Sequence, residues 1–164
     1  MTRIFVLADT HMNNLAGLPP PMAREVSDAD LVVHCGDFTG RTFLDELQQQ
    51  ARSLAAVYGN TDGTAIRQRL PDKLVIDIAG HTIAIIHPSW GGPPWQMDKE
   101  IAQVFPEADI ILFGHTHEPE KKWRKGTLWL NPGQGYSTVG YPATYAILHI
   151  EDGRVDAEIM EVGK

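Results

Sequence analysis

Residues 109–117, DIILFGHTH, join a short apolar run to a glycine and two histidines. The run Ile110–Phe113 predicts a strand that is buried on both faces, and Gly114 ends it. His115 and His117 are two residues apart, so in an extended turn their side chains point the same way. Ligand sites of open α/β sheets lie where buried strands end. The stretch therefore predicts two imidazoles presented together at a strand end, and two polar residues on a surface turn are the alternative.

Strands and helices alternate in the first half of the sequence, and strands dominate the second half. Apolar and alternating runs predict strands over residues 3–8, 31–34, 54–58, 73–78, 82–86, 110–113, 120–124, 127–130, 143–150 and 154–160. Helical spacing of apolar residues predicts helices over residues 22–29, 40–51, 64–70 and 96–105, and residues 12–21 are predicted to form a loop. This order of elements predicts an α/β fold.

Side chains able to bind metal recur where the predicted strands end. They are Asp9 and His11, then Asp37, Asn60, His87, and finally His115 and His117. All of them are expected at one edge of a sheet, and glycine directly precedes three of them, where it permits a tight turn. Nitrogen and oxygen ligands without a thiolate suit Mn, Fe, Zn, Ni or Mg. Seven ligands exceed what one four-coordinate ion needs, and they suffice for two ions that share a carboxylate.

Length, charge and cysteine content narrow the class of protein. The chain has 164 residues, which we interpret as one domain over residues 1–164. Its net charge of -7 argues against a nucleic-acid binder or a binder of anionic membranes. Cys35 is the single cysteine, expected in the core, and neither a signal peptide nor an apolar run of about 20 residues is visible. These features predict a cytoplasmic protein without a membrane span.

The order D-x-H, GD, GN, H and GHTH resembles the signature of the calcineurin-like metallophosphoesterase family, and within it the YfcE-like phosphodiesterases. The motifs cover residues 4 to about 133, where residues 131–133, NPG, resemble the family's closing turn. The resemblance implies a four-layer α/β/β/α sandwich. It also implies a dinuclear site, in which Asp9, His11 and His117 hold the first metal, Asn60, His87 and His115 hold the second, and Asp37 bridges the two.

The resemblance further implies a phosphodiesterase in which a hydroxide bridging two divalent metal ions attacks phosphorus in line. Asp37, Asn60 and His87 are the expected catalytic residues, and the Asn60 amide can also donate a hydrogen bond to a phosphate oxygen. Manganese is the first expectation for the metal, and Ni, Fe, Zn or Mg also fit the ligands. The expected substrate is a small phosphodiester, with nucleotides as candidates, and apolar residues over 135–145 are a candidate interface of a homo-oligomer.

The position after the GN motif departs from the family's pattern. Many members carry a histidine there that protonates the leaving group, whereas Thr61 and then Asp62 follow Asn60 here. Two hypotheses follow: the enzyme favours diesters with acidic leaving groups, or Asp62 acts indirectly by orienting a ligand or a water molecule.

Three further residues are candidates for substrate binding. Trp90 and Trp95 flank a loop of glycines and prolines, and they are either a packed surface loop or an aromatic lid that stacks on a planar group. Arg41 follows Asp37 by four residues and is either a phosphate ligand or a solvated helix residue. His34 precedes the GD turn and is the histidine outside the motifs most suited to support the site.

Two other classes of function compete with a phosphodiesterase. A subunit of a eukaryotic sorting complex shares the family fold with an incomplete ligand set, so a non-catalytic scaffold is one alternative. A phosphomonoesterase or nuclease on the same fold is the other, and a nuclease usually carries basic patches. The only basic cluster, residues 121–125, is interpreted as a solvated edge strand. Every ligand position of the signature is filled, which favours the enzyme.

Overall fold

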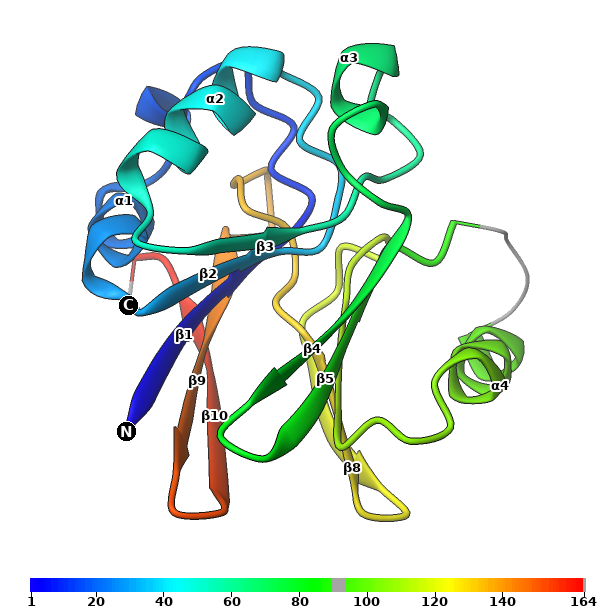
Figure 1. The fold of residues 1–164 in the computed structure, drawn as a ribbon. Coiled ribbons are helices and arrows are strands. Elements are labelled where there is room, and N and C mark those ends of the chain that lie inside the picture. Colours follow the sequence, from blue (N-terminus) through cyan, green and yellow to red (C-terminus); the bar gives the residue numbers. More distant parts are fainter. Residues whose placement is uncertain (90–93, 164) are drawn as a thin grey trace.

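Two five-stranded mixed sheets form the centre of the protein in a computed structural model, which describes residues 1–89 and 94–163, with side chains for all of these except 94 and 95. The first sheet has the order β10-β9-β1-β2-β3, and the second has the order β4-β5-β6-β8-β7 (Figure 1). The strands of the first sheet are β1 (Thr2–Leu7), β2 (Leu31–His34), β3 (Leu54–Ala56), β9 (Thr144–Glu151) and β10 (Arg154–Glu161). Those of the second are β4 (Lys73–Ile78), β5 (His81–Ile86), β6 (Ile110–Phe113), β7 (Glu120–Arg124) and β8 (Thr127–Asn131).

The two sheets face each other across an apolar core. Side chains alternate along a strand, so Ile4 and Val6 of β1 point to the second sheet, while Phe5 and Leu7 point to the helices. Ile83 and Ile110, of β5 and β6, meet the first sheet in this core. Because β1 and β6 are buried on both faces, they are continuous apolar runs in the sequence.

Helices cover the outer face of each sheet. The outer face of the first sheet packs against α1 (Pro20–Asp28) and α2 (Arg41–Gln50), and α3 (Thr64–Arg67) adds Ile66 to the same cluster. The outer face of the second sheet packs against α4 (Pro94–Val104) through Ile101. Figure 1 shows α1 and α2 on one side of the paired sheets and α4 on the other. The predicted four-layer α/β/β/α sandwich is confirmed.

The predicted elements all form, with one clear difference near the N-terminus. Residues 12–21 were expected to be a loop, but Leu15–Gly17 forms a 3₁₀ helix and α1 already begins at Pro20. Proline is tolerated in the first turn of a helix, because its missing N–H would have no partner within the helix there. A smaller difference is that β3 ends at Ala56, two residues earlier than predicted.

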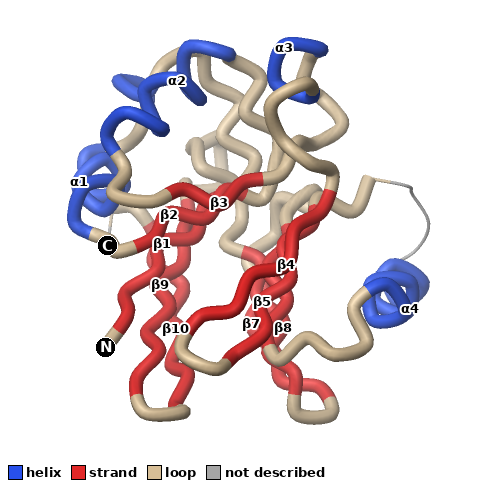
Figure 2. Tube along the Cα trace, viewed as in Figure 1, coloured by secondary structure: helices blue, strands red, loops and turns tan. Residues whose placement is uncertain are grey.

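The strands that carry the signature motifs point the same way. β1 pairs in parallel with β2, and β2 with β3, while β5 pairs in parallel with β6. Their carboxyl ends therefore lie at one edge, where the loops that follow them gather above the two sheets (Figure 2). Among the described helices, none is both long enough and apolar enough to cross a membrane.

The basic residues on β7 contact the two neighbouring elements α4 and β10. Lys122 and Arg124 each contact the buried carboxylate of Asp98 on α4, at 2.9 and 2.6 Å, and Lys121 donates to the Ala157 carbonyl at 2.7 Å. The predicted solvated edge strand is confirmed, since Lys121, Arg124 and Lys125 are exposed, and three of the cations also contact α4 or β10.

Candidate metal centre

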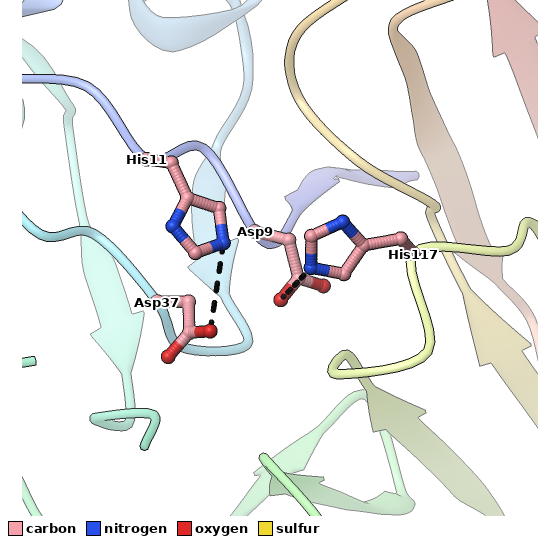
Figure 3. Close-up of side chains that lie close together, drawn as sticks. All are labelled: Asp9, His11, Asp37 and His117. Atoms are coloured by element: carbon pink, nitrogen blue, oxygen red, sulfur yellow. Dashed lines mark ion pairs between the residues drawn. The ribbon is translucent and has the colours of Figure 1, made fainter. Parts of the chain in front are cut away.

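Loops that follow five strands bring the predicted ligands together. Asp9 and His11 follow β1, Asp37 follows β2, Asn60 follows β3, His87 follows β5, and His115 and His117 follow β6. Of these, Asp9, His11, Asp37 and His117 offer ligand atoms that all lie within 4.8 Å of one another (Figure 3). We call these four residues the first group, and Asn60, His87 and His115 the second group.

The first group has the geometry of a cation site. The Nε2 atom of His11 lies 3.5 Å from Oδ2 of Asp37, and Nε2 of His117 lies 3.4 Å from Oδ1 of Asp9. Oδ1 of Asp9 and Nε2 of His11 are buried and have no hydrogen-bond partner in the described part of the chain. Buried polar atoms are rarely left without a partner, and a cation would satisfy both of them. The first group therefore fits a divalent metal ion.

The second group places two acceptor atoms face to face. Nδ1 of His87 lies 2.8 Å from the Cys35 carbonyl oxygen, which can only accept, so Nδ1 carries the proton and Nε2 keeps its lone pair. That Nε2 lies 3.0 Å from Oδ1 of Asn60, and Nδ1 of His115 lies 3.2 Å from the same oxygen. Nε2 and the amide oxygen repel each other unless a cation lies between them. The second group therefore also fits a metal ion.

The backbone at these ligands is strained. Left-handed φ angles occur at Asp9 (48°), His11 (47°), Asp37 (62°), His115 (81°) and His117 (63°). A non-glycine residue in this region costs on the order of 1–3 kcal/mol, and such strain clusters at functional sites. Hydrogen bonds between the first two motifs, from Asp9 N–H to the Gly36 oxygen at 2.9 Å and from His11 N–H to the Asp37 oxygen at 3.2 Å, hold these turns in place.

Glycines next to the ligands allow close approach. A Cβ atom at Gly59 would lie 2.1 Å from Oδ1 of Asp37, and one at Gly36, where φ is +98°, would lie 2.7 Å from Nδ1 of His87. Any other residue would push the Asp37 carboxylate or the His87 imidazole out of place. The sequence prediction that glycine serves the turns before Asp37 and Asn60 agrees with this packing.

Burial controls the protonation of the ligands. The pKa of Asp9 is raised from 3.8 to about 8, mainly by desolvation and also by the Asp37 and Asp62 carboxylates, against a hydrogen bond from the His115 N–H that lowers it. Burial lowers the pKa of His11 and of His87, so both imidazoles are neutral near pH 7 and can bind a cation. The site thus favours a buried positive charge that can replace the proton on Asp9.

Comparison with known proteins agrees with this geometry. The family model described as a calcineurin-like phosphoesterase superfamily domain matches residues 2–153. The chain belongs to this superfamily. A probable metallophosphoesterase of Methanocaldococcus jannaschii is 34% identical over 137 residues, which cover 79% of this chain and 66%, just under two thirds, of that relative. A phosphodiesterase of the same organism is 28% identical over 165 residues, which cover 91% of this chain and 93% of that relative.

The fold is shared with a protein of a different kind. The crystal structure of Vps29 from Entamoeba histolytica, complexed with Zn²⁺, matches with a TM-score of 0.76 and 24% identity, over 98% of this chain and 99% of that one. At this identity the likeness shows the fold alone. The predicted family and fold are confirmed, and the structure contains a cluster of side chains that could hold a metal ion, Asp9, His11, Asp37 and His117.

Thr61 and Asp62, which follow Asn60, form hydrogen bonds with the turns that carry Asp37 and Asn60. The carboxylate of Asp62 is buried and accepts three backbone N–H groups, from Asp37 at 3.0 Å, Thr39 at 2.8 Å and Gly59 at 2.8 Å. Thr61 donates its N–H to Oδ1 of Asp37 at 2.9 Å. Asp62 therefore orients the turn that carries Asp37, which is the indirect role that the sequence left open for it.

Gln134 and His34 support the ligands through hydrogen bonds. Oε1 of Gln134 is 3.3 Å from Nδ1 of His117 and can only accept, so Nδ1 donates and Nε2 faces Asp9 with its lone pair. The Gln134 amide is held by its bond to the Tyr136 carbonyl at 2.9 Å. His34, fully buried, accepts from the Gly36 N–H at 3.1 Å and contacts Thr10 at 3.0 Å, which agrees with the supporting role predicted for it.

Sequence reasoning missed Gln134, although it directly follows residues 131–133.

Arg41, Trp90 and Trp95 are the residues outside the metal ligands that the sequence predicts to bind substrate. Arg41 is not brought into the site: its side chain is 71% exposed on α2 and pairs with Asp45 at 3.7 Å, because a helix turn directs it to solvent. Trp90 and the side chain of Trp95 lie outside the described part of the chain.

Proposed function

We propose that the protein is a phosphodiesterase whose two groups of ligands hold two divalent cations. One observation carries the proposal: Oδ2 of Asp37 lies 3.5 Å from Nε2 of His11, in the first group, and 3.5 Å from Nε2 of His87, in the second group. A carboxylate oxygen in this position can be shared between two cations. Asp37 is therefore the bridging ligand in the proposal, with Asp9, His11 and His117 on one side and Asn60, His87 and His115 on the other.

The chain's own side chains support chemistry at phosphorus. Two cations, when bound, supply an activated water molecule for in-line attack and offset the charge that develops on the phosphate. Asn60 presents its amide oxygen to the second group, which leaves its N–H₂ to donate to a phosphate oxygen. His11 and His87 stay neutral because burial lowers their pKa, so they hold the site without competing as proton donors.

The proposed substrate is a small phosphodiester with an acidic leaving group. The relative named as a phosphodiesterase supports diesters as the substrate class. Thr61 stands where many members of the family carry a proton donor, and Asp62 is occupied by three backbone N–H groups, so leaving groups that need no proton are favoured. Manganese is the proposed metal, since imidazole, carboxylate and amide ligands accept it along with Ni, Fe, Zn and Mg.

The test is hydrolysis of bis(4-nitrophenyl) phosphate by chelator-stripped protein to which Mn²⁺, Ni²⁺, Zn²⁺ or Mg²⁺ is returned singly. We expect Mn²⁺ to restore turnover and Asp37→Asn to reduce kcat by about a thousandfold or more, equivalent to about 4 kcal/mol. Arg41→Gln, on the exposed face of α2, is the matched control and should retain the rate. A folded protein that is inactive with every metal would overturn the proposal.

The alternatives predict other results in the same assay. A non-catalytic scaffold would bind metal, as the zinc-bound Vps29 structure does, and would hydrolyse nothing. The complete ligand set of both groups argues against it. A phosphomonoesterase would prefer 4-nitrophenyl phosphate to the diester. A nuclease would need a basic surface, but Lys122 and Arg124 are paired with Asp98. Cys35 is fully buried, which suits the cytoplasmic location that we also propose.

A further inference from the structure

A cavity of about 260 Å³ opens directly beside the second ligand group. Asn60 and His87, two of the proposed metal ligands, form one wall. The remaining wall comes from Tyr58, Arg67, Asp72, Ile86 and Ser89. The cavity is therefore continuous with the proposed reaction centre, on the side of the second group.

The Arg67 guanidinium covers the Tyr58 ring at this cavity, and the ring in turn packs against the core under the helices. The guanidinium carbon of Arg67 lies 4.8 Å from the centre of the Tyr58 ring. Nε of Arg67 donates to the Asp62 carbonyl at 2.6 Å, and Nη2 donates to the Asn60 carbonyl at 3.1 Å. The guanidinium is thus fixed in orientation, and Nη1 has no hydrogen bond to any described residue. A planar group can stack on the guanidinium face that points away from Tyr58 and accept a hydrogen bond from Nη1, while the Tyr58 ring supports the guanidinium from behind.

The charges in the cavity select a neutral group. Arg67 contributes one positive charge and Asp72 one negative charge, so the wall outside the ligands is balanced. A second anionic group would meet the Asp72 carboxylate, whereas hydroxyl and imide N–H groups would find an acceptor there. Pockets for drug-sized ligands have volumes of about 300–1,000 Å³, so this smaller cavity admits one arm of a diester and not an oligomer.

We infer that this cavity binds one arm of the substrate, and that the arm is neutral, planar and about the size of a nucleoside. The inference rests on the proposed function, because the arm is placed relative to a phosphate at the metal centre. Tyr58 and Arg67 then determine which diesters are used. Arg41, the candidate phosphate ligand predicted from the sequence, is directed to solvent and takes no part in this cavity.

Two substrates with the same leaving group test the inference. Thymidine 5′-(4-nitrophenyl phosphate) and ethyl 4-nitrophenyl phosphate both release 4-nitrophenolate, and only the arm that is retained differs. With Mn²⁺ present, we expect kcat/KM to favour the thymidine ester by about tenfold or more, as stacking of one base on an aromatic side chain provides. The preference should arise in KM rather than in kcat.

A pair of variants at one position separates stacking from a structural effect. Tyr58→Phe keeps the flat ring and should keep the preference, while Tyr58→Leu should lower it to about one. Arg67→Lys should also lower it, and Arg69→Lys, whose side chain pairs with Asp45 at 2.6 Å outside the cavity, is its matched control. Equal kcat/KM values for the two esters, or a preference that survives Tyr58→Leu, would overturn the inference.

A second readout does not depend on turnover. Titration of ¹⁵N-labelled, metal-free protein with thymidine should give saturable shifts at the backbone amides of residues 58, 67 and 72, and Tyr58→Leu should abolish them. Absence of such shifts in the wild-type protein would overturn the inference even if both esters are hydrolysed. If neither ester is hydrolysed with any metal, the proposed function fails as well. Because the thymidine titration does not depend on turnover, it distinguishes failure of the arm-binding cavity from failure of the proposed function.

Discussion

The two ligand groups differ in charge and burial, although they share one edge of the fold. The first group contains two carboxylates, Asp9 and Asp37, and the Asp9 side chain is fully buried. The second group contains no carboxylate: it offers the Asn60 amide and two imidazoles, and in the proposed centre Asp37 is the carboxylate that both groups share. Charge attracts a cation more strongly in a buried site, so the difference indicates an order of binding in which the first group fills first.

The two carboxylates of the first group also destabilise the metal-free protein. Two carboxylates face each other in the first group, and burial favours the protonated form of Asp9. A cation relieves this repulsion and satisfies the unpartnered Oδ1 of Asp9. The second group holds no buried carboxylate of its own, so it gains less from a cation. Three predictions test this asymmetry.

The largest expected effect separates the two groups by substitution. Asp9→Asn removes the charge that distinguishes the first group, and we expect kcat/KM to fall about a thousandfold, equivalent to about 4 kcal/mol. Asn60→Ala leaves both carboxylates in place, and its kcat/KM should fall less, by about a hundredfold. Binding of Mn²⁺ measured by titration calorimetry should lose the tighter site in Asp9→Asn and the weaker site in Asn60→Ala. Loss of the same site in both variants would contradict the order of binding.

A smaller effect is expected from a residue that only positions a ligand. Gln134→Leu removes the acceptor that fixes the proton of His117 on Nδ1, so Nε2 is no longer held toward Asp9. Loss of such a partner weakens metal binding by about 10–100-fold. The loss should be confined to the tighter Mn²⁺ site, whereas Gln103→Leu, an exposed change on α4, should alter neither site. A uniform loss at both sites would mean that the turn had simply unfolded.

The metal ligands could be predicted from the sequence because each follows a buried strand. A run such as Ile110–Phe113 defines both the strand and the place where it ends, and parallel pairing of β5 with β6 brings separate ends together. The α/β/β/α layers were implied by the family resemblance and not by the run itself, because β1 is apolar throughout. Only the structure shows that one set of its side chains faces the inner core and the other the helices.

Residues that act from loops could not be found in this way. Gln134 reaches His117 because the chain after Asn131 turns back past the β1 motif, where Gly135 N–H contacts the Ala8 oxygen at 3.1 Å, and no local pattern encodes that turn. Arg41 was predicted from its spacing after Asp37, but the direction of a side chain on α2 depends on how the helix packs. For Asp62 an orienting role could be predicted but its partners could not, because the three backbone N–H groups that it accepts come from two separate turns.

The smallest effect is a pH dependence of stability that belongs to the first group. Because the pKa of Asp9 is about 8 in the folded protein and 3.8 ordinarily, its protonated form stabilises the fold fully below about pH 4, and this contribution is lost as the pH rises through about 8. Between pH 7.5 and 8.5, where histidines of the unfolded chain are mostly neutral, metal-free protein should lose about 0.7 kcal/mol, or about 2 °C in Tm. Added Mn²⁺ replaces the proton and should remove the dependence. Asp9→Asn, neutral at every pH, should show none, and a Tm of the metal-free wild type that rises over this range would contradict the electrostatic difference between the two groups.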